Sequence, residues 1–147
     1  MADMPIEGIV LSEFAMKDYD AAIALWRQCP GIGLSPADER PDISAFLGRN
    51  PGLSFAAWSG ESLVGTSLCG SDGRRGYLYH VAVEPGRRGL GIGRALVEAS
   101  LAALSAAGIR KCHLFVLASN ESGAGFWRAV GWFKREDISV FSRDIPG

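Results

Sequence analysis

Two stretches of the chain are apolar or aromatic at consecutive positions rather than at alternate ones. They read YLYHVAV at 77–83 and KCHLFVL at 111–117. A strand with this pattern must be covered on both faces, because its apolar side chains point to both sides of the sheet. The segment 89–107 between them is rich in Ala and Leu and has only a narrow polar edge, which predicts a largely buried helix. These features predict an α/β fold with helices on both faces of a sheet.

The rest of the chain continues this alternation of strands and helices. Apolar spacing and Gly or Pro residues mark where the elements begin and end. The predicted strands are 8–14, 53–58, 62–69, 77–83, 111–117 and two within 132–145, and the predicted helices are 18–28, 42–49, 89–107 and 121–130. The order is therefore β-α-α-β-β-β-α-β-α-β-β. It predicts a mixed, mostly antiparallel sheet in a single domain over residues 1–147.

Composition narrows the class of partner. The chain has 147 residues and a net charge of −1, with acids and bases mixed along it, so neither nucleic acid nor a membrane surface is expected as a partner. The N-terminus has an acid at position 3 and no long apolar run, unlike a signal peptide. Cys29, Cys69 and Cys112 lack the spacing of metal or redox motifs. Reduced thiols and a cytoplasmic location are expected.

The sequence RRGLGIGRAL at 87–96 places three glycines at the start of the predicted helix 89–107. Backbone N–H groups there can approach a ligand closely, and the first N–H groups of a helix lack partners within it. The segment therefore predicts an anion site. It does not fit the nucleoside triphosphate loop, because Ile92 stands where Lys is needed. It does not fit the dinucleotide fingerprint either, because Lys111 lies where an acid is needed.

The longer stretch VAVEPGRRGLGIGRALV at 81–97 resembles the acyl-coenzyme A signature of the GCN5-related N-acetyltransferase (GNAT) family. In that signature a strand ending in Val is followed by Arg or Gln, two residues, and Gly-x-Gly or Gly-x-Ala. Arg88, Gly91 and Gly93 fill those positions. The later NESGAGFWRAVGW at 120–132 is similar to the family's Asn, small residue, two aromatics and Gly-aromatic. The predicted order of elements also resembles the family's fold over nearly the whole chain.

The resemblance implies acetyl-CoA as the acetyl donor, bound without a metal. N–H groups from Arg88 to Arg94 would hold the pyrophosphate, aided by the helix dipole and by one of these two arginines. The backbone of Val81 and Val83 would pair with the pantetheine arm, and the N–H of Val83 would donate to the oxyanion. The implied coenzyme-binding residues are Val81, Val83, Arg88, Gly89, Gly91, Gly93, Arg94 and Asn120. An alternative for Gly93 is a role in packing the helix against the sheet alone.

The resemblance also implies acetyl transfer to a primary amine by direct attack on the thioester. A base must then take a proton from the ammonium. His80 and Tyr79 are the candidates for this base or its water chain, and a hydrogen-bonded core histidine is the alternative for His80. A regular strand would turn Tyr77 and Tyr79 away from the face of His80, whereas a bulge, frequent in the family here, would change that parity. His113 is expected to be structural.

The C-terminal motif departs from the family at its second aromatic. Many members have Tyr there, whose hydroxyl protonates the leaving thiolate, whereas this chain has Trp127. An indole N–H donates hydrogen bonds but is no proton source near neutral pH. Trp127 is therefore expected to shape the acetyl pocket while the thiolate leaves without a tyrosine acid. The alternative is a core Trp127 with Tyr77 or Tyr79 as the acid.

Two other functions stay open. One is a non-catalytic acyl-CoA sensor, which needs no titratable group near the thioester, and the other is an enzyme acting on a protein N-terminus or lysine. The loop at 30–41 would separate a peptide substrate from a small amine, because a peptide needs an open groove. Its acids form a solvated loop and a helix cap or line a site for a cationic amine: Asp38, Glu39 and Asp42. A homodimer is left open.

Overall fold

The structure is a computed structural model that describes residues 6–147. The chain divides into two compact units, of which the first ends at Phe115 and the second runs over Val116–Gly147. The prediction on a signal peptide falls partly on residues 1–5, outside the described residues. Within the described part of the chain, no helix is long and apolar enough to cross a membrane.

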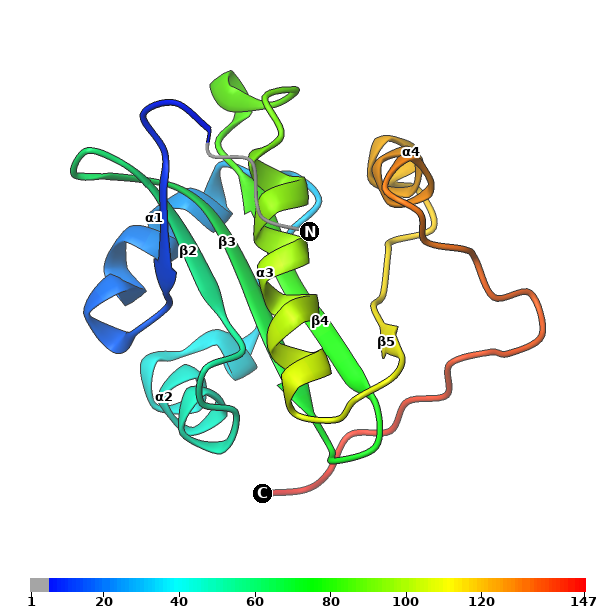
Figure 1. Ribbon diagram of the computed structural model, residues 1–147. Coiled ribbons are helices and arrows are strands. Elements are labelled where there is room, and N and C mark those ends of the chain that lie inside the picture. The colour runs from blue at the N-terminus through cyan, green and yellow to red at the C-terminus, as the bar shows by residue number, and fades with distance from the viewer. Residues whose placement is uncertain (1–5) are drawn as a thin grey trace. The chain divides into compact units, whose positions relative to one another are not determined.

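The first unit contains a five-stranded sheet with the order β1-β2-β3-β4-β5 (Figure 1). Its strands are β1 (Val10–Glu13), β2 (Phe55–Ser59), β3 (Ser62–Ser71), β4 (Gly76–Val83) and β5 (Cys112–His113). The first four pair antiparallel with their neighbours, and β5 pairs parallel to β4. Parallel neighbours need a crossover connection, which α3 (Ile92–Ala106) supplies. The predicted mixed, mostly antiparallel sheet is confirmed.

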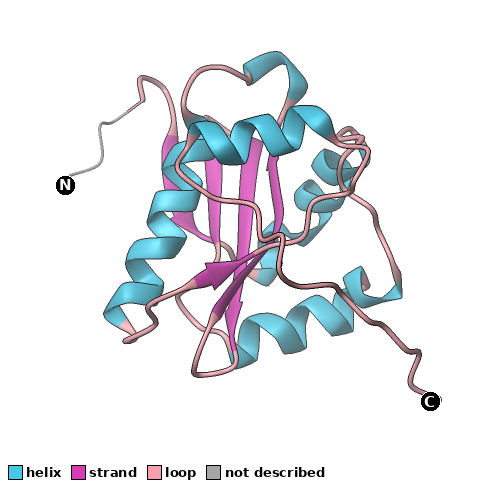
Figure 2. Ribbon diagram, turned by 90° about the vertical axis from the view of Figure 1, so that its right-hand side faces the viewer, coloured by secondary structure: helices cyan, strands magenta, loops and turns pink. Residues whose placement is uncertain are grey.

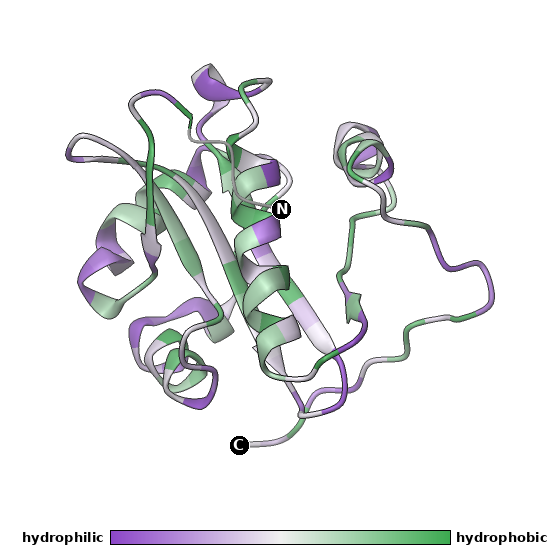
Figure 3. Ribbon diagram, in the orientation of Figure 1, coloured by the Kyte–Doolittle hydropathy of each residue, from purple (hydrophilic) through white to green (hydrophobic). Residues whose placement is uncertain are grey.

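Helices cover both faces of this sheet, as the two-faced apolar strands predict (Figure 2). α1 (Tyr19–Arg27) and α2 (Arg40–Arg49) pack on one face. Their buried cluster includes Trp26, Ile43, Ala56, Leu68 and Ala82. On the other face, α3 packs Ile92 and Leu96 against Val64. Figure 3 shows α3 hydrophobic over most of its length, in keeping with the prediction of a largely buried helix.

Two elements differ from the prediction by three residues or more at one end. α3 begins at Ile92 rather than at 89, because Gly89 and Gly91 adopt positive φ angles that a right-handed helix does not use. β5 covers only Cys112–His113 instead of 111–117. A strand forms only where a neighbour supplies hydrogen bonds, and β4 pairs with β5 at two positions alone.

The prediction of two further strands within 132–145 is wrong. The second unit contains one helix, α4 (Glu121–Ala129), and the described residues after it form no strand or helix. The side chains of Val140 and Phe141 are 66% and 95% exposed. A β-branched residue and an aromatic residue favour a strand locally but do not by themselves provide a pairing partner.

Candidate active site

A bulge interrupts β4 at His80. Thr66 of β3 pairs with Ala82 of β4. Leu68, two residues further along β3, pairs with Tyr79, which lies three residues back along β4. The extra residue of β4 is accommodated with a φ of +46° at His80, the left-handed region that a non-glycine residue enters at a cost of about 1–3 kcal/mol. Backbone strain of this size persists only where surrounding contacts enforce it.

Buried contacts hold this bulge in place. The hydroxyl of Thr66 donates to the carbonyl of His80 at 2.8 Å. The same hydroxyl accepts from the indole N–H of Trp26 at 2.8 Å. The Trp26 ring also lies against the imidazole of His80, with 4.7 Å between the ring centroids. Both the backbone and the side chain of His80 are therefore fixed.

The bulge turns Tyr79 and His80 to the same face of the sheet. Tyr79 contacts Phe46 of α2 edge to face, with 5.9 Å between the ring centroids. His80 contacts Trp26 of α1, and α1 and α2 share one face of the sheet. Consecutive residues of a regular strand would point to opposite faces. The predicted change of parity at a bulge is confirmed.

His80 forms a half-buried pair with Asp38. Its Nε2 lies 2.7 Å from Oδ1 of Asp38, and the two side chains are 16% and 11% exposed. The other carboxylate oxygen of Asp38, Oδ2, accepts from the backbone N–H of Ser35 at 2.9 Å. Both oxygens therefore have partners, and Asp38 is buried, so it is not the solvated loop acid of the first expectation.

The loop at 30–41 brings Asp38 to His80. Asp38 ends the short 3-10 helix η2 (Pro36–Asp38), whose N-terminus is capped by the hydroxyl of Ser35. The hydroxyl of Tyr19 in α1 donates to the backbone carbonyl of Asp38 at 2.6 Å. The other two acids of the loop, Glu39 and Asp42, are exposed at the start of α2, as expected for a solvated helix start.

The second ring nitrogen of His80, Nδ1, has no hydrogen-bond partner among the described residues. A neutral imidazole that donates Nε2–H to a carboxylate keeps its lone pair on Nδ1. Such a ring can accept a proton while the carboxylate stabilises the resulting imidazolium. The pair has the arrangement of a general base and the acid that orients it.

The sequence alone could not pair these two residues. Asp38 and His80 are 42 positions apart, and Asp38 stands among other acids of the same loop. The sequence also does not identify Thr66 and Trp26, which fix the bulge, because a Thr in a strand and a Trp in a helix carry no local signal of such a role. The one readable sign is Ser35 three residues before Asp38, the spacing of a capping box.

β4 has a free edge next to the bulge. β5 pairs only with the first two residues of β4, and within the first unit no other strand continues along that edge. The N–H of Glu84 donates to the carbonyl of Val64 in β3 at 2.8 Å. Successive residues of a strand point their backbone groups to opposite edges, so the N–H groups of Val83 and Val81 face away from β3. An extended ligand can pair with them as an added strand.

A glycine loop follows β4 directly. After the 3-10 helix η3 (Pro85–Arg87), Gly89 and Gly91 have φ angles of +81° and +89°. A Cβ at Gly89 would meet no atom within 4 Å, so the backbone conformation, rather than lack of space, requires glycine there. Gly91 is the N-cap of α3 and provides no side-chain hydrogen bond. The first N–H groups of α3 are therefore open to an anion.

Two arginines border the glycine loop. The Nε of Arg88 donates to the carbonyl of Val83 at 3.4 Å, and Arg94 is exposed in the first turn of α3. Gly93 is buried in the same turn, which also suits its alternative role in packing. The predicted coenzyme-binding residues from Val81 to Arg94 thus lie on one continuous segment from β4 to α3.

The two other predicted residues lie in the second unit. The side-chain oxygen of Asn120 accepts from the N–H of Gly123 at 3.0 Å and so caps α4. The ring of Trp127 lies between those of Phe126 and Trp132, with centroid distances of 5.0 Å to each. Both residues have a role within their own unit, and their roles towards the coenzyme stay predictions.

A cavity of about 270 Å³ lies beside Tyr79 on the α2 side of the sheet. Phe46, Tyr77 and Tyr79 provide its aromatic walls, and Asp72 lies at its exposed end. Burial raises the pKa of Tyr79, so its phenol stays protonated at neutral pH. Its O–H can therefore donate a hydrogen bond, but the protonated phenol is not a base.

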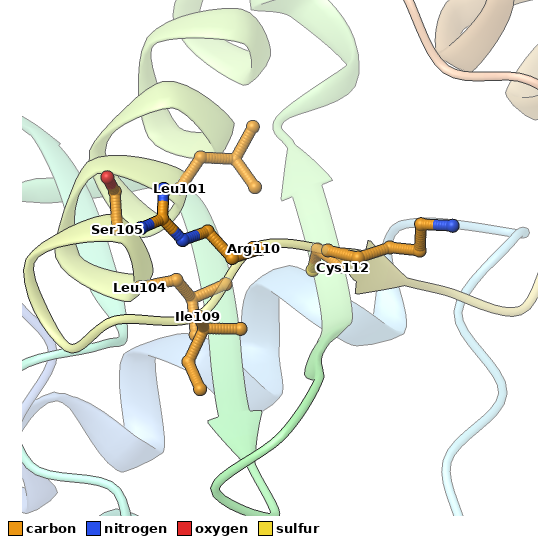
Figure 4. A pocket seen from close by; sticks show the side chains of 7 residues that line it. Leu101, Leu104, Ser105, Ile109, Arg110 and Cys112 are labelled. Carbon is orange, nitrogen blue, oxygen red and sulfur yellow. The ribbon is translucent and has the colours of Figure 1, made fainter.

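A separate cavity of about 320 Å³ lies at the C-terminal end of α3, away from the glycine loop (Figure 4). Leu101, Leu104 and Ile109 line it together with Arg110.

Burial raises the pKa of Cys112, at the border of this cavity, to about 11, and that of Cys69 in β3 to about 12. Neither thiol is a nucleophile at neutral pH. The described residues hold no group of three His, Cys, Asp or Glu side chains that could bind a metal.

Both the sequence and the fold match known proteins. Residues 18–132 match the acetyltransferase (GNAT) family. An acetyltransferase of Pectobacterium atrosepticum is 36% identical over 133 residues, which cover 90% of this chain and 93% of the relative. The structure of the PaiA N-acetyltransferase of Thermoplasma acidophilum in complex with coenzyme A has a TM-score of 0.78 at 20% identity, over 89% of this chain and 92% of that one. An aminoglycoside N-acetyltransferase in complex with coenzyme A has a TM-score of 0.73 at 16% identity, over 93% and 95%. The chain therefore belongs to the GNAT family and is an acetyltransferase.

Proposed function

We propose that this acetyltransferase transfers the acetyl group of acetyl-CoA to the primary amine of a small molecule. One observation carries the proposal: the His80–Asp38 pair lies at the bulge of β4, beside the free edge of that strand. The glycine loop follows at the end of the same strand. This short segment thus carries three candidate features in order: a base, a free strand edge that an extended thioester could pair with, and an anion site.

The donor substrate would lie along this segment. Its pyrophosphate would contact the N–H groups of Gly89 and Gly91 in the glycine loop and that of Gly93 in the first turn of α3. The side chains of Arg88 and Arg94 would add positive charge. The pantetheine arm would run along the free edge of β4 and pair with Val83 and Val81, which directs the thioester towards His80. From the second unit, Asn120 is proposed as a further contact to the coenzyme.

At the bulge, the acceptor ammonium must lose a proton before or during attack. Nδ1 of His80 would take that proton, directly or through a water molecule, and the amine nitrogen would then bond to the thioester carbon. The carbonyl oxygen gains negative charge, which the N–H of Val81 would stabilise. Val81 is adjacent to His80, whereas Val83 is two residues further away, and the base and the oxyanion donor must both reach the same carbon. Collapse of this adduct releases the coenzyme A thiolate, and the nitrogen loses its second proton to water, which leaves the neutral amide.

The thiolate then needs a proton or must leave without one. A thiol of pKa about 8–9 is a tolerable leaving group, so a dedicated acid is not essential. We propose that Trp127 shapes the acetyl pocket and donates no proton. The phenol of Tyr79, kept protonated by its raised pKa, is the alternative acid.

Two observations support a small amine as the acceptor, and one supports an enzyme over a sensor. Asp38 and Tyr19 fasten the loop at 30–41 to α1 and to His80, which favours an enclosed site over an open peptide groove. A sensor would have no use for an oriented base beside the thioester. One fold neighbour is an aminoglycoside N-acetyltransferase, a protein that acts on a small molecule.

A cytoplasmic location would suit the three cysteines, all of which are free.

The test is a panel of amines, amino acids, polyamines and peptides, with release of the coenzyme A thiol as the readout. We expect turnover of at least one small amine by the wild type, strong loss of it in His80→Asn, and no turnover of peptides. Binding of acetyl-CoA without thiol release from any acceptor would instead support a sensor. Efficient turnover of peptides would contradict the small-molecule proposal.

A further inference from the structure

The carboxylate of Asp38 is fixed in one orientation. Oδ2 accepts from the backbone N–H of Ser35 at 2.9 Å, and Oδ1 faces Nε2 of His80 at 2.7 Å. The backbone is fixed as well, because the N–H of Asp38 donates to the carbonyl of Ser35 and its carbonyl accepts from Tyr19. The carboxylate cannot turn away from His80 without breaking its bond to Ser35.

A carboxylate only accepts hydrogen bonds, so the ring nitrogen facing it must carry the proton. The hydrogen bond at one nitrogen of a histidine decides which nitrogen keeps the lone pair. At His80 this leaves the lone pair on Nδ1, which has no partner among the residues that the structure describes. The ring cannot readily flip to exchange the two nitrogens, because it lies against Trp26 with 4.7 Å between centroids.

We propose that Asp38 is a positioning residue of this acetyltransferase: it holds His80 as the Nε2–H tautomer, so that Nδ1 is the atom that takes the proton of the amine. Asp38 does not touch the amine, because both of its oxygens are engaged. The inference rests on the proposed role of His80 as the base. It adds the nitrogen atom that reacts and the residue that selects it.

The variant D38N tests this by reversing the hydrogen bond. The N–H of Ser35 still needs an acceptor, so the amide oxygen of the new side chain should take the place of Oδ2. Its NH2 group then faces Nε2 of His80, which becomes an acceptor, and the proton moves to Nδ1. We expect kcat to fall about 10²-fold or more, with KM for acetyl-CoA unchanged.

The variant D38A is the matched comparison. It removes more of the side chain but imposes neither tautomer, so a fraction of the molecules keeps the lone pair on Nδ1, and we expect kcat to fall only about tenfold. A merely structural role of Asp38 predicts the opposite order. Asparagine keeps the shape of the side chain and the bond to Ser35, whereas alanine loses both.

Nitrogen NMR of the imidazole identifies the tautomer and does not depend on an activity assay. The chain has two histidines, so a His113→Gln background leaves His80 as the single imidazole to follow. We expect Nε2–H in this background and Nδ1–H when D38N is added. Retention of Nε2–H in D38N, or a D38A variant as slow as D38N, would overturn the inference. An undiminished rate in His80→Asn would overturn the proposed base instead, so the two failures are distinguishable.

Discussion

The bulge at His80 and the glycine loop 88–91 lie at opposite ends of the same functional segment and are built by opposite means. At the bulge, a non-glycine residue has a φ of +46°, and side chains from α1, β3 and η2 hold it there. At the loop, glycines adopt positive φ without strain. A Cβ at Gly91 would meet only Ile6, at 3.9 Å. The proposed base is thus fixed through its side-chain neighbours, whereas the proposed anion site is made by the main chain.

The difference has consequences for substitution. A change at the bulge alters the position or protonation of one imidazole, on which the rate of proton transfer depends steeply. A change at the loop is tolerated where the new residue accepts positive φ and adds no negative charge. The two regions should therefore separate the rate of the reaction from the affinity for the donor.

The largest effect is expected for His80→Asn. Asparagine tolerates the left-handed conformation but offers no imidazole, so the fold should survive while proton transfer fails. We expect kcat to fall about 10²–10⁴-fold. The dissociation constant for acetyl-CoA, measured by calorimetry, should stay within about twofold, because the backbone of the loop is proposed to bind the donor. If the affinity for acetyl-CoA fell by the same factor as kcat, the bulge and the loop would not act separately on rate and affinity.

The same difference explains how much of the site the sequence could predict. The glycine loop could be predicted because its requirements are local: three glycines at short spacing, a preceding strand and a following helix. The pairing of His80 with Asp38 could not, since it depends on how α1 and η2 pack on the sheet. A bulge at this strand is implied only by the family resemblance. Its consequence for parity follows from strand geometry and is correct.

The fold shows the same limit. The order of elements up to α4 follows from local patterns of apolar residues and agrees with the structure. The strands predicted within 132–145 do not form, although ISVFSR at 138–143 contains β-branched and aromatic residues that favour a strand. Pairing is a non-local property, and strand propensity alone does not supply the neighbour.

The second effect concerns the glycine loop and compares Gly91→Asp with Gly91→Asn. Both side chains tolerate positive φ and both are good N-caps, so neither should disturb α3. Only aspartate adds a negative charge where the pyrophosphate is proposed to bind. We expect the dissociation constant for acetyl-CoA to be about tenfold higher for the aspartate variant, and the gap to narrow at high salt. Equal affinities for acetyl-CoA in the two folded variants would mean that the pyrophosphate does not bind at this loop.

The third effect tests the strain at the bulge. Replacing His80 by alanine keeps the unfavourable positive φ, whereas glycine relieves it. The relief, about 1–2 kcal/mol, exceeds the entropic cost of glycine, so His80→Gly should unfold with a free energy about 0.5–1 kcal/mol higher than His80→Ala. Urea denaturation measures this difference. At the neighbouring Val81, which has no positive φ, the order should reverse, with Val81→Gly less stable than Val81→Ala. The same order at both positions would mean that His80 is not strained.

The smallest effect is expected at Trp127. The proposed mechanism assigns proton transfer to the bulge and donor affinity to the glycine loop, so α4 takes no part in proton transfer. Trp127→Phe keeps an aromatic ring beside Phe126 and Trp132, and we expect kcat to change less than about threefold. The pH–rate profile of the wild type should also show no falling limb in the usual tyrosine range around pH 10. A tyrosine acid works only while protonated, so its activity would fall as the pH rises through its pKa. Burial raises the pKa of Tyr79, which moves any such fall to still higher pH.

Tyr79→Phe separates the remaining cases. If the thiolate leaves without a tyrosine acid, the rate of this variant should stay close to that of the wild type across the whole pH range. Tyr77→Phe serves as the matched control, since Tyr77 lines the same cavity beside Phe46 but lies further along β4 from His80. A falling alkaline limb in the wild type that disappears in either variant would place the acid on β4 and contradict the proposal for Trp127. The bulge would then contribute both proton transfers, and the glycine loop would still contribute only affinity.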